Sequence, residues 1–190
     1  MLVAPGAHDV MTARIVEAEV FQALYLRGFT TSASILGIPD HSLITMTELL
    51  DQARKVAAVV DIPIISDIDD AGGTPLNALR TMRLVEQAGL AAMHIGDLIP
   101  GKRFLGHKDR MCTKEQAVDR IKAVVDARTD LDFVIIARSD AINVSTFGEA
   151  VEHVNAYAEA GGPAFLAVFG ASGYQKGRRR FIEAAAQCGD

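Results

Sequence analysis

The chain is predicted to be a single parallel α/β domain, and three features of its sequence indicate this class. Segments patterned like strands and segments patterned like helices alternate along all 190 residues. No linker or low-complexity tract interrupts the alternation. The run of residues 62–65 is apolar without alternation, as expected for a strand that helices cover on both faces. In this class the sites of chemistry lie at the carboxyl ends of the strands.

The first two strand-helix units follow from local signals. A short strand runs into the Pro5-Gly6 turn, and apolar residues at helical spacing follow over 10–20. The second strand is expected over 23–26 and leads into a loop of small and polar residues at 27–34. The stretch Thr45 to Glu48 has the spacing of a capping box, which starts the next helix.

Two further units occupy the middle of the chain. A strand begins at residue 62, and Thr74-Pro75 then places an N-cap residue before a proline at the first position of a helix that stops at Gly89. The fourth strand is expected over 91–95. A long connection rich in glycine and positive charge follows over 96–112, and long connections in compact domains are usually functional or mobile.

The last two units are defined in the same way. Thr113 to Gln116 forms a capping box, and a strand over 133–137 ends on an arginine. A helix capped at Thr146 stops at the glycine pair 161–162. The final elements are a strand over 164–169 and a helix over 177–187.

Composition excludes several classes of function. A net charge of −5 argues against a nucleic-acid surface, so a small-molecule partner is expected. No apolar run is long enough for a membrane span, and no signal peptide is recognised. Cys112 and Cys188 are far apart and form no metal or disulfide motif, which favours a cytoplasmic protein.

The most informative stretch is Asp67-Ile68-Asp69-Asp70, at the end of the third strand. Side chains alternate along a strand, so Asp67 and Asp69 are expected to share one face. Two such carboxylates can bind Mg2+, which takes oxygen ligands and keeps some of its waters. The alternative is that the stretch is only a turn at the end of a strand.

Charged residues also follow other strands. Arg27, Asp97, Arg138 and Asp140 all stand at predicted carboxyl ends, and core packing does not require a charge at any of them. For Asp97 and Asp140, a functional role and a simple role as solvated loop charges are equally compatible with the sequence.

Four stretches, taken in order, resemble the isocitrate lyase/phosphoenolpyruvate mutase superfamily. They are Pro5 to Asp9, Thr31 to Asp40, Asp67 to Asp69 and Ile135 to Asp140. The branch most similar to the chain contains methylisocitrate lyase-like, dimethylmalate lyase-like and carboxyphosphonoenolpyruvate mutase-like enzymes. The resemblance implies a TIM (β/α)8-type barrel, here incomplete with about six βα units. It also implies Mg2+ and lyase or mutase chemistry on small 2-oxo or hydroxy acids through an enolate.

The resemblance further implies roles for individual residues. Asp67 and Asp69 match the metal-binding acids, and Asp40 matches an acid that supports the waters of the metal. Arg138 matches the arginine that holds a substrate carboxylate or phosphonate. Lys102 and His107 fall in the catalytic loop after the fourth strand. Tyr25, Arg27, Gly28 and Phe29 match the segment whose backbone N–H groups donate hydrogen bonds to the oxygens of the oxo acid. The family usually has Ser or Thr where this chain has Arg27.

Three positions depart from the family pattern. Gly96 occupies the position at which the family usually has a glutamate that supports the metal. Phe104-Leu105 occupies the place at which the lyases have a catalytic cysteine, and Val168 lies near the position of another family acid. The sequence therefore leaves an alternative open, a catalytically impaired or inactive shortened relative, and it predicts weakened Mg2+ binding. Asp70 and Asp97 are the candidates to replace the glutamate. Six strands leave two sheet edges, which favours a homo-oligomer.

Overall fold

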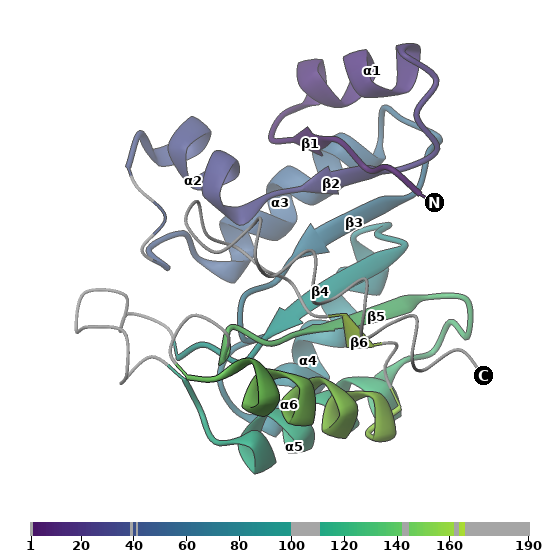
Figure 1. The fold of residues 1–190 in the computed structure, drawn as a ribbon. Coiled ribbons are helices and arrows are strands. Elements are labelled where there is room, and N and C mark those ends of the chain that lie inside the picture. The colour runs from purple at the N-terminus through teal and green to yellow at the C-terminus, as the bar shows by residue number, and fades with distance from the viewer. Residues whose placement is uncertain are drawn as a thin grey trace.

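A parallel sheet with its strands in chain order forms the centre of the molecule (Figure 1). The computed structural model describes residues 2–38, 40, 42–99, 111–141 and 145–161, and the backbone of 164–165. Within these residues every strand pairs in parallel with the next one along the chain. The strands are β1 (Gly6–Ala7), β2 (Leu24–Leu26), β3 (Ile64–Asp67), β4 (Ala92–Gly96), β5 (Val134–Arg138) and β6 (Ala164–Phe165).

Helices connect the strands and pack on the outer face of the sheet. They are α1 (Val10–Ala18), α2 (Gly28–Leu36), α3 (Met46–Ala57), α4 (Pro75–Gln87), α5 (Lys114–Ala127) and α6 (Phe147–Glu159). One helix stands between successive strands, except that both α2 and α3 stand between β2 and β3. This βα alternation with neighbouring strands in chain order is the arrangement of the first six units of a TIM (β/α)8 barrel, which confirms the predicted fold class. The predicted helix over 177–187 lies outside the described residues.

The predicted helix starts are confirmed. Thr45, Thr74, Thr113 and Thr146 each accept a hydrogen bond at the side-chain oxygen from the N–H three residues later. Loss of such a cap typically costs about 1 kcal/mol. Asp9 is a further cap, beyond those predicted, and it forms a reciprocal capping box with Thr12 at the start of α1.

The segment predicted as a loop at 27–34 is instead the helix α2, so that prediction is wrong. Most of its residues are small or polar and form no continuous apolar stripe, which is why the sequence does not reveal a helix. Tertiary packing decides the conformation. Thr31 and Ser32 are fully buried or nearly so, α2 contacts α3, and Gly37 ends the helix in the left-handed conformation with φ 66°.

Strand register determines which side chains share the inner face of the sheet. Asp67 pairs with His94, and Gly96 pairs with Arg138. Tyr25 is in register with Ile65, two residues before Asp67, so its side chain is on the same face. Side chains on the opposite face join the core under the helices: Leu24, Leu26, Met93, Ile95, Ile135 and Ala137.

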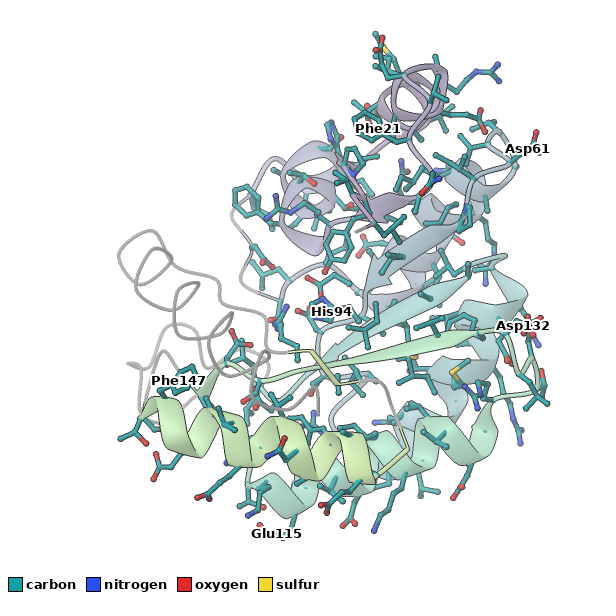
Figure 2. All side chains as sticks on the ribbon, turned by 45° about the vertical axis from the view of Figure 1, so that its right-hand side comes forward. Phe21, Asp61, His94, Glu115, Asp132 and Phe147 are labelled. Atoms are coloured by element: carbon teal, nitrogen blue, oxygen red, sulfur yellow. The ribbon has the colours of Figure 1, made fainter. Side chains whose placement is uncertain are left out.

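The two ends of the strands lie on opposite sides of the molecule. Asp61 and Asp132, which precede β3 and β5, lie on one side, and Phe147, the first residue of α6, lies on the other (Figure 2). The carboxyl ends of the strands therefore face the side on which α6 begins. In the described part of the chain, no helix has both the length and the hydropathy needed to cross a bilayer.

Candidate active site

A small cavity lies at the carboxyl ends of the strands. Its volume is about 180 Å³. Residues from β2, β3 and β5, from the segment after β2 that includes α2, and from the turn after β5 line it: Tyr25, Arg27, Phe29, Asp40, Asp67, Arg138 and Asp140. Most of the predicted site residues within the described chain therefore meet at one place. Lys102 and His107 lie outside the described residues.

Arg138 is the most constrained charged group at this cavity. It is only 4 % exposed, its Nε donates to Asp140 Oδ2 at 2.9 Å, and its Nη1 lies 3.6 Å from Asp67 Oδ2. Burial acts to lower the pKa of Arg138, but the neighbouring carboxylates of Asp67 and Asp140 outweigh it and raise the pKa above its usual value. The guanidinium is therefore permanently charged and held in a fixed orientation.

A turn separates Asp67 from Asp69, so the prediction that both side chains lie on one face of a continuous strand is wrong. β3 ends at Asp67, and Asp69 has a left-handed backbone with φ 49°. The Asp69 N–H donates to Asp67 Oδ1 at 3.3 Å, and its carbonyl accepts from Gly96 N–H at 2.6 Å. The carboxylate of Asp69 still influences the pKa of both Tyr25 and Arg138, which places its charge near the cavity.

The donor set at this end of β3 fits a hard divalent cation. Asp67 and Asp40 line the same cavity, and Asp69 is half-buried beside it, so carboxylate oxygen is the available ligand chemistry. Among the described residues, no three or more His, Cys, Asp or Glu side chains converge as a metal cage. Mg2+ does not need one, because it usually binds through one or two carboxylates and keeps several waters.

Tyr25, which lines the cavity, forms a pair with the buried His94. The Tyr25 hydroxyl lies 2.6 Å from His94 Nδ1. Burial lowers the pKa of His94 to about 4, so the ring is neutral at neutral pH. Burial, aided by the charge of Asp67, raises the pKa of the Tyr25 hydroxyl. His94 is therefore a hydrogen-bonded core residue.

The start of α2 supplies free N–H groups at the cavity. The first N–H groups of a helix have no intrahelical acceptor, and Arg27, the N-cap residue, gives no side-chain cap. A Cβ built on Gly28 would lie 3.7 Å from Asp67 Oδ2, so the helix start approaches the acid directly. This helix N-terminus has the chemistry predicted for the segment, since it presents backbone donors and a positive dipole to an anion.

Gly96 takes part in this arrangement through the space above it. A Cβ on Gly96 would lie 3.1 Å from Arg138 Nη2 and 3.3 Å from its Cζ. The guanidinium therefore lies over the glycine and fills the volume in which a side chain at position 96 would begin.

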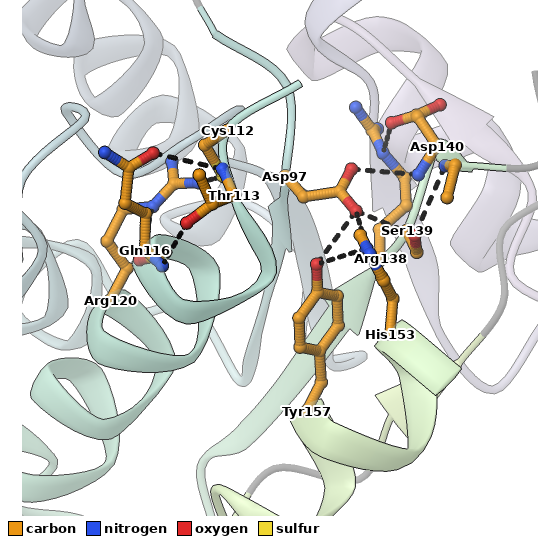
Figure 3. Close-up of polar contacts among 11 residues, drawn as sticks. Asp97, Cys112, Thr113, Gln116, Arg120, Arg138, Ser139, Asp140, His153 and Tyr157 are labelled. Carbon is orange, nitrogen blue, oxygen red and sulfur yellow. Dashed lines mark hydrogen bonds and ion pairs between the residues drawn. The ribbon is translucent and has the colours of Figure 1, made fainter. Parts of the chain in front are cut away.

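Asp97 does not replace the missing glutamate, because it belongs to a buried polar network (Figure 3). It is fully buried, and its Oδ2 accepts from Ser139 Oγ at 2.7 Å and from the Tyr157 hydroxyl at 2.9 Å. Its Oδ1 accepts from the N–H of Asp140 at 2.9 Å. Asp97 thus fixes the turn after β5, and the interpretation of Asp97 and Asp140 as solvated charges is wrong.

Asp70 also turns away from the cavity. It is 4 % exposed, and its Oδ2 lies 3.7 Å from Nη1 of Arg120, which also donates to its backbone carbonyl at 3.2 Å. Arg120 Nη2 is 2.5 Å from the sulfur of Cys112 (Figure 3). Burial raises the pKa of Asp70 and of the Cys112 thiol. These three residues line a different, larger cavity of about 370 Å³ beside the starts of α4 and α5.

Several residues of the site and of the polar networks beside it give no signal in their own sequence context. Asp140 was recognised only as a strand-end charge, although it anchors Arg138. Tyr157 and Arg120 lie within helices, where a buried tyrosine or arginine follows the same spacing as the core. Their partners are 60 and 50 residues away, and no local signal points to them.

Comparison with known proteins adds an independent line of evidence. The family model described as phosphoenolpyruvate phosphomutase matches residues 1–185. The chain is 42 % identical over 163 residues to 2,3-dimethylmalate lyase of Eubacterium barkeri, a match that covers 85 % of this chain and 56 % of that protein. It is 40 % identical over 159 residues to 2-methylisocitrate lyase of Escherichia coli K12, covering 82 % of this chain and 53 % of that protein.

A solved structure shows the same similarity in three dimensions. The complex of phosphonopyruvate hydrolase with oxalate and Mg++ superposes with a TM-score of 0.81 at 31 % identity, covering 88 % of this chain and 58 % of the other. The chain thus spans a little over half the length of the relatives it matches.

Proposed function

Since the chain belongs to the phosphoenolpyruvate phosphomutase family, we propose that its cavity binds Mg2+ and a small 2-oxo or 2-hydroxy acid and supports lyase or mutase chemistry through an enolate. The observation that carries the proposal is the meeting of Asp67, Arg138 and the start of α2 at one cavity. Carboxylates for a cation and donors for an anion lie side by side there. This combination suits a chelating oxo acid.

Each group has a distinct part in the proposal. Asp67 and Asp69 would hold Mg2+, with Asp40 hydrogen-bonded to its waters, and the ion would neutralise the charge that develops on the enolate oxygen. Arg138 binds the substrate carboxylate, and Asp140 fixes the plane of its guanidinium. The N–H groups of Gly28 and Phe29 donate to the oxo-acid oxygens.

We also propose that this site binds Mg2+ more weakly than one with an acid at position 96 would. Gly96 offers no carboxylate, and neither Asp70 nor Asp97 lines the cavity. The guanidinium of Arg138 lies 3.6 Å from Asp67 and adds a positive charge beside the cation ligand. Nothing in the comparisons favours the alternative of a catalytically inactive relative.

Calorimetry with oxalate tests the proposal, because oxalate mimics the planar enolate. We expect oxalate to bind in the presence of millimolar Mg2+ and to bind at least tenfold more weakly to Asp67→Asn. The matched control is Asp51→Asn, the same substitution in an exposed ion pair with Arg54 on α3. Absence of oxalate binding to the unmodified protein at millimolar Mg2+ would refute the proposal.

Self-association is a separate proposal. β1 pairs with β2 alone among the described strands, which leaves its other edge without a described partner. We expect a homo-oligomer in sedimentation velocity experiments, and a stable monomer would contradict this.

A further inference from the structure

Arg27 differs from Arg138 in having no side-chain partner among the described residues. Its backbone N–H donates to the carbonyl of Ala7, and its own carbonyl accepts from Thr31 N–H. Across the residues that the structure describes, however, its guanidinium makes no ion pair and no hydrogen bond. Arg138, in contrast, is paired with both Asp67 and Asp140.

The side chain of Arg27 nevertheless belongs to the candidate active site. It lines the same cavity of about 180 Å³ as Tyr25, Asp67 and Arg138. Arg27 lies two residues beyond Tyr25 with an extended backbone, φ −88° and ψ 129°, so its side chain is directed to the inner face of the sheet. A charged arginine therefore lies at the cavity, and no group in the described part of the chain accepts a hydrogen bond from its guanidinium.

Gly6 on β1 makes room for this placement. A Cβ built on Gly6 would lie 2.8 Å from Arg27 Cδ, so the stem of the arginine crosses directly over the glycine. Gly6 is not among the residues with positive φ, and its backbone therefore does not require glycine. Glycine at this position instead leaves open the space that the arginine stem occupies.

We propose that Arg27 binds a second anionic group of the substrate and so makes the site selective for four-carbon 2-hydroxy or 2-oxo dicarboxylates over the corresponding monocarboxylates. This inference rests on the proposed function and adds a residue that determines specificity within it. One carboxylate of the substrate pairs with Arg138, and the distal carboxylate pairs with Arg27, which lines the same cavity. A guanidinium is well suited to this role because it can bind a carboxylate through two parallel hydrogen bonds.

Malate and lactate form a matched pair of probes, because they share the 2-hydroxy acid and differ in the distal carboxylate. Calorimetry at millimolar Mg2+ should show malate binding at least tenfold more tightly than lactate. In Arg27→Met, which keeps an unbranched stem and removes the charge, the ratio of malate to lactate affinity should fall by about tenfold. Arg27→Lys should restore part of the ratio.

A second variant tests the structural basis of the selectivity. Gly6→Ala should push the arginine stem aside and reduce the ratio in the same direction as Arg27→Met. In the Arg27→Met background the same change should have little further effect on the ratio, since the guanidinium is already gone.

The outcomes separate this inference from the proposed function. If oxalate binds with Mg2+ but malate and lactate bind equally well, or Arg27→Met weakens both probes by the same factor, the role of Arg27 is refuted and the proposed function stands. If oxalate does not bind, both are refuted.

Discussion

Replacing Tyr157 with phenylalanine gives the sharpest test of the network around Asp97. The tyrosine is fully buried, and its hydroxyl donates to Asp97 Oδ2 at 2.9 Å. Removal of that hydroxyl takes one of three hydrogen bonds from a carboxylate that has no access to water. Hydrogen bonds to a charged group contribute about 1.5–3 kcal/mol, so we expect Tyr157→Phe to lower the free energy of unfolding by that amount.

The size of this effect can be measured against a matched substitution. Tyr25→Phe also removes a hydroxyl from a hydrogen bond, but its partner is the neutral His94 ring, so the expected loss is about 0.5–1.5 kcal/mol. Urea denaturation followed by circular dichroism gives both values. In a thermal scan, the Tyr157→Phe change corresponds to a lowering of Tm by roughly 3–12 °C for a domain of this size.

A double-mutant cycle with Asp97→Asn isolates the pair. The loss caused by Tyr157→Phe should shrink in the Asp97→Asn background, because the acceptor is then uncharged. If Tyr157→Phe costs less than about 0.5 kcal/mol, or no more than Tyr25→Phe, the reasoning that Asp97 is a buried charge held by its donors is refuted.

Three further predictions concern other parts of the described chain. Burial lowers the pKa of His94 to about 4 from 6.5 in the unfolded chain, so the unfolded state takes up more protons between these values. Stability should therefore fall by up to about 3 kcal/mol as the pH is lowered from 7 to 4, and urea titrations of His94→Asn should show a shallower decline. Gly96→Ala places a Cβ 3.1 Å from Arg138 Nη2, and we expect a loss of about 1–3 kcal/mol in stability together with weaker oxalate binding by calorimetry. Asp9→Ala removes the cap of α1 and should cost about 1 kcal/mol in urea denaturation, whereas Asp9→Asn should retain most of the stability because asparagine also caps helices.

Helix starts that depend on three or four consecutive residues were predictable from the sequence. Thr45, Thr113 and Thr146 begin helices in the structure as predicted, because a capping box is complete within one turn. The order of strands was also predictable, since a parallel strand needs a crossover connection and the helices supply it. α2 was not predictable, because burial of Thr31 and Ser32 against the rest of the domain, and not an apolar stripe, holds it in place.

The candidate site was predictable at the level of its strand ends but not of its contacts. The position of Asp67 and Arg138 at the ends of β3 and β5 follows from the βα pattern. The left-handed turn at Asp69 does not, because nothing in the local sequence distinguishes a continued strand from a strand that stops at Asp67. The burial of Asp97 depends on Tyr157, 60 residues later, and sequence alone does not pair them.

The sequential order of the strands has a consequence for when the site can form. Each strand pairs with the next one along the chain, so every contact within the sheet closes a loop of similar, moderate length, and the domain can be assembled one unit at a time from either end. The cavity, in contrast, is complete only when the fifth unit is in place. Its lining comes from β2, β3 and β5, from the segment after β2 and from the turn after β5. A chain in which only the elements up to β4 are folded therefore contains Asp67 without Arg138, the arginine that pairs with it. Binding of an oxo acid would therefore report on the docking of the fifth unit, and ligand would stabilise only chains in which that unit is in place.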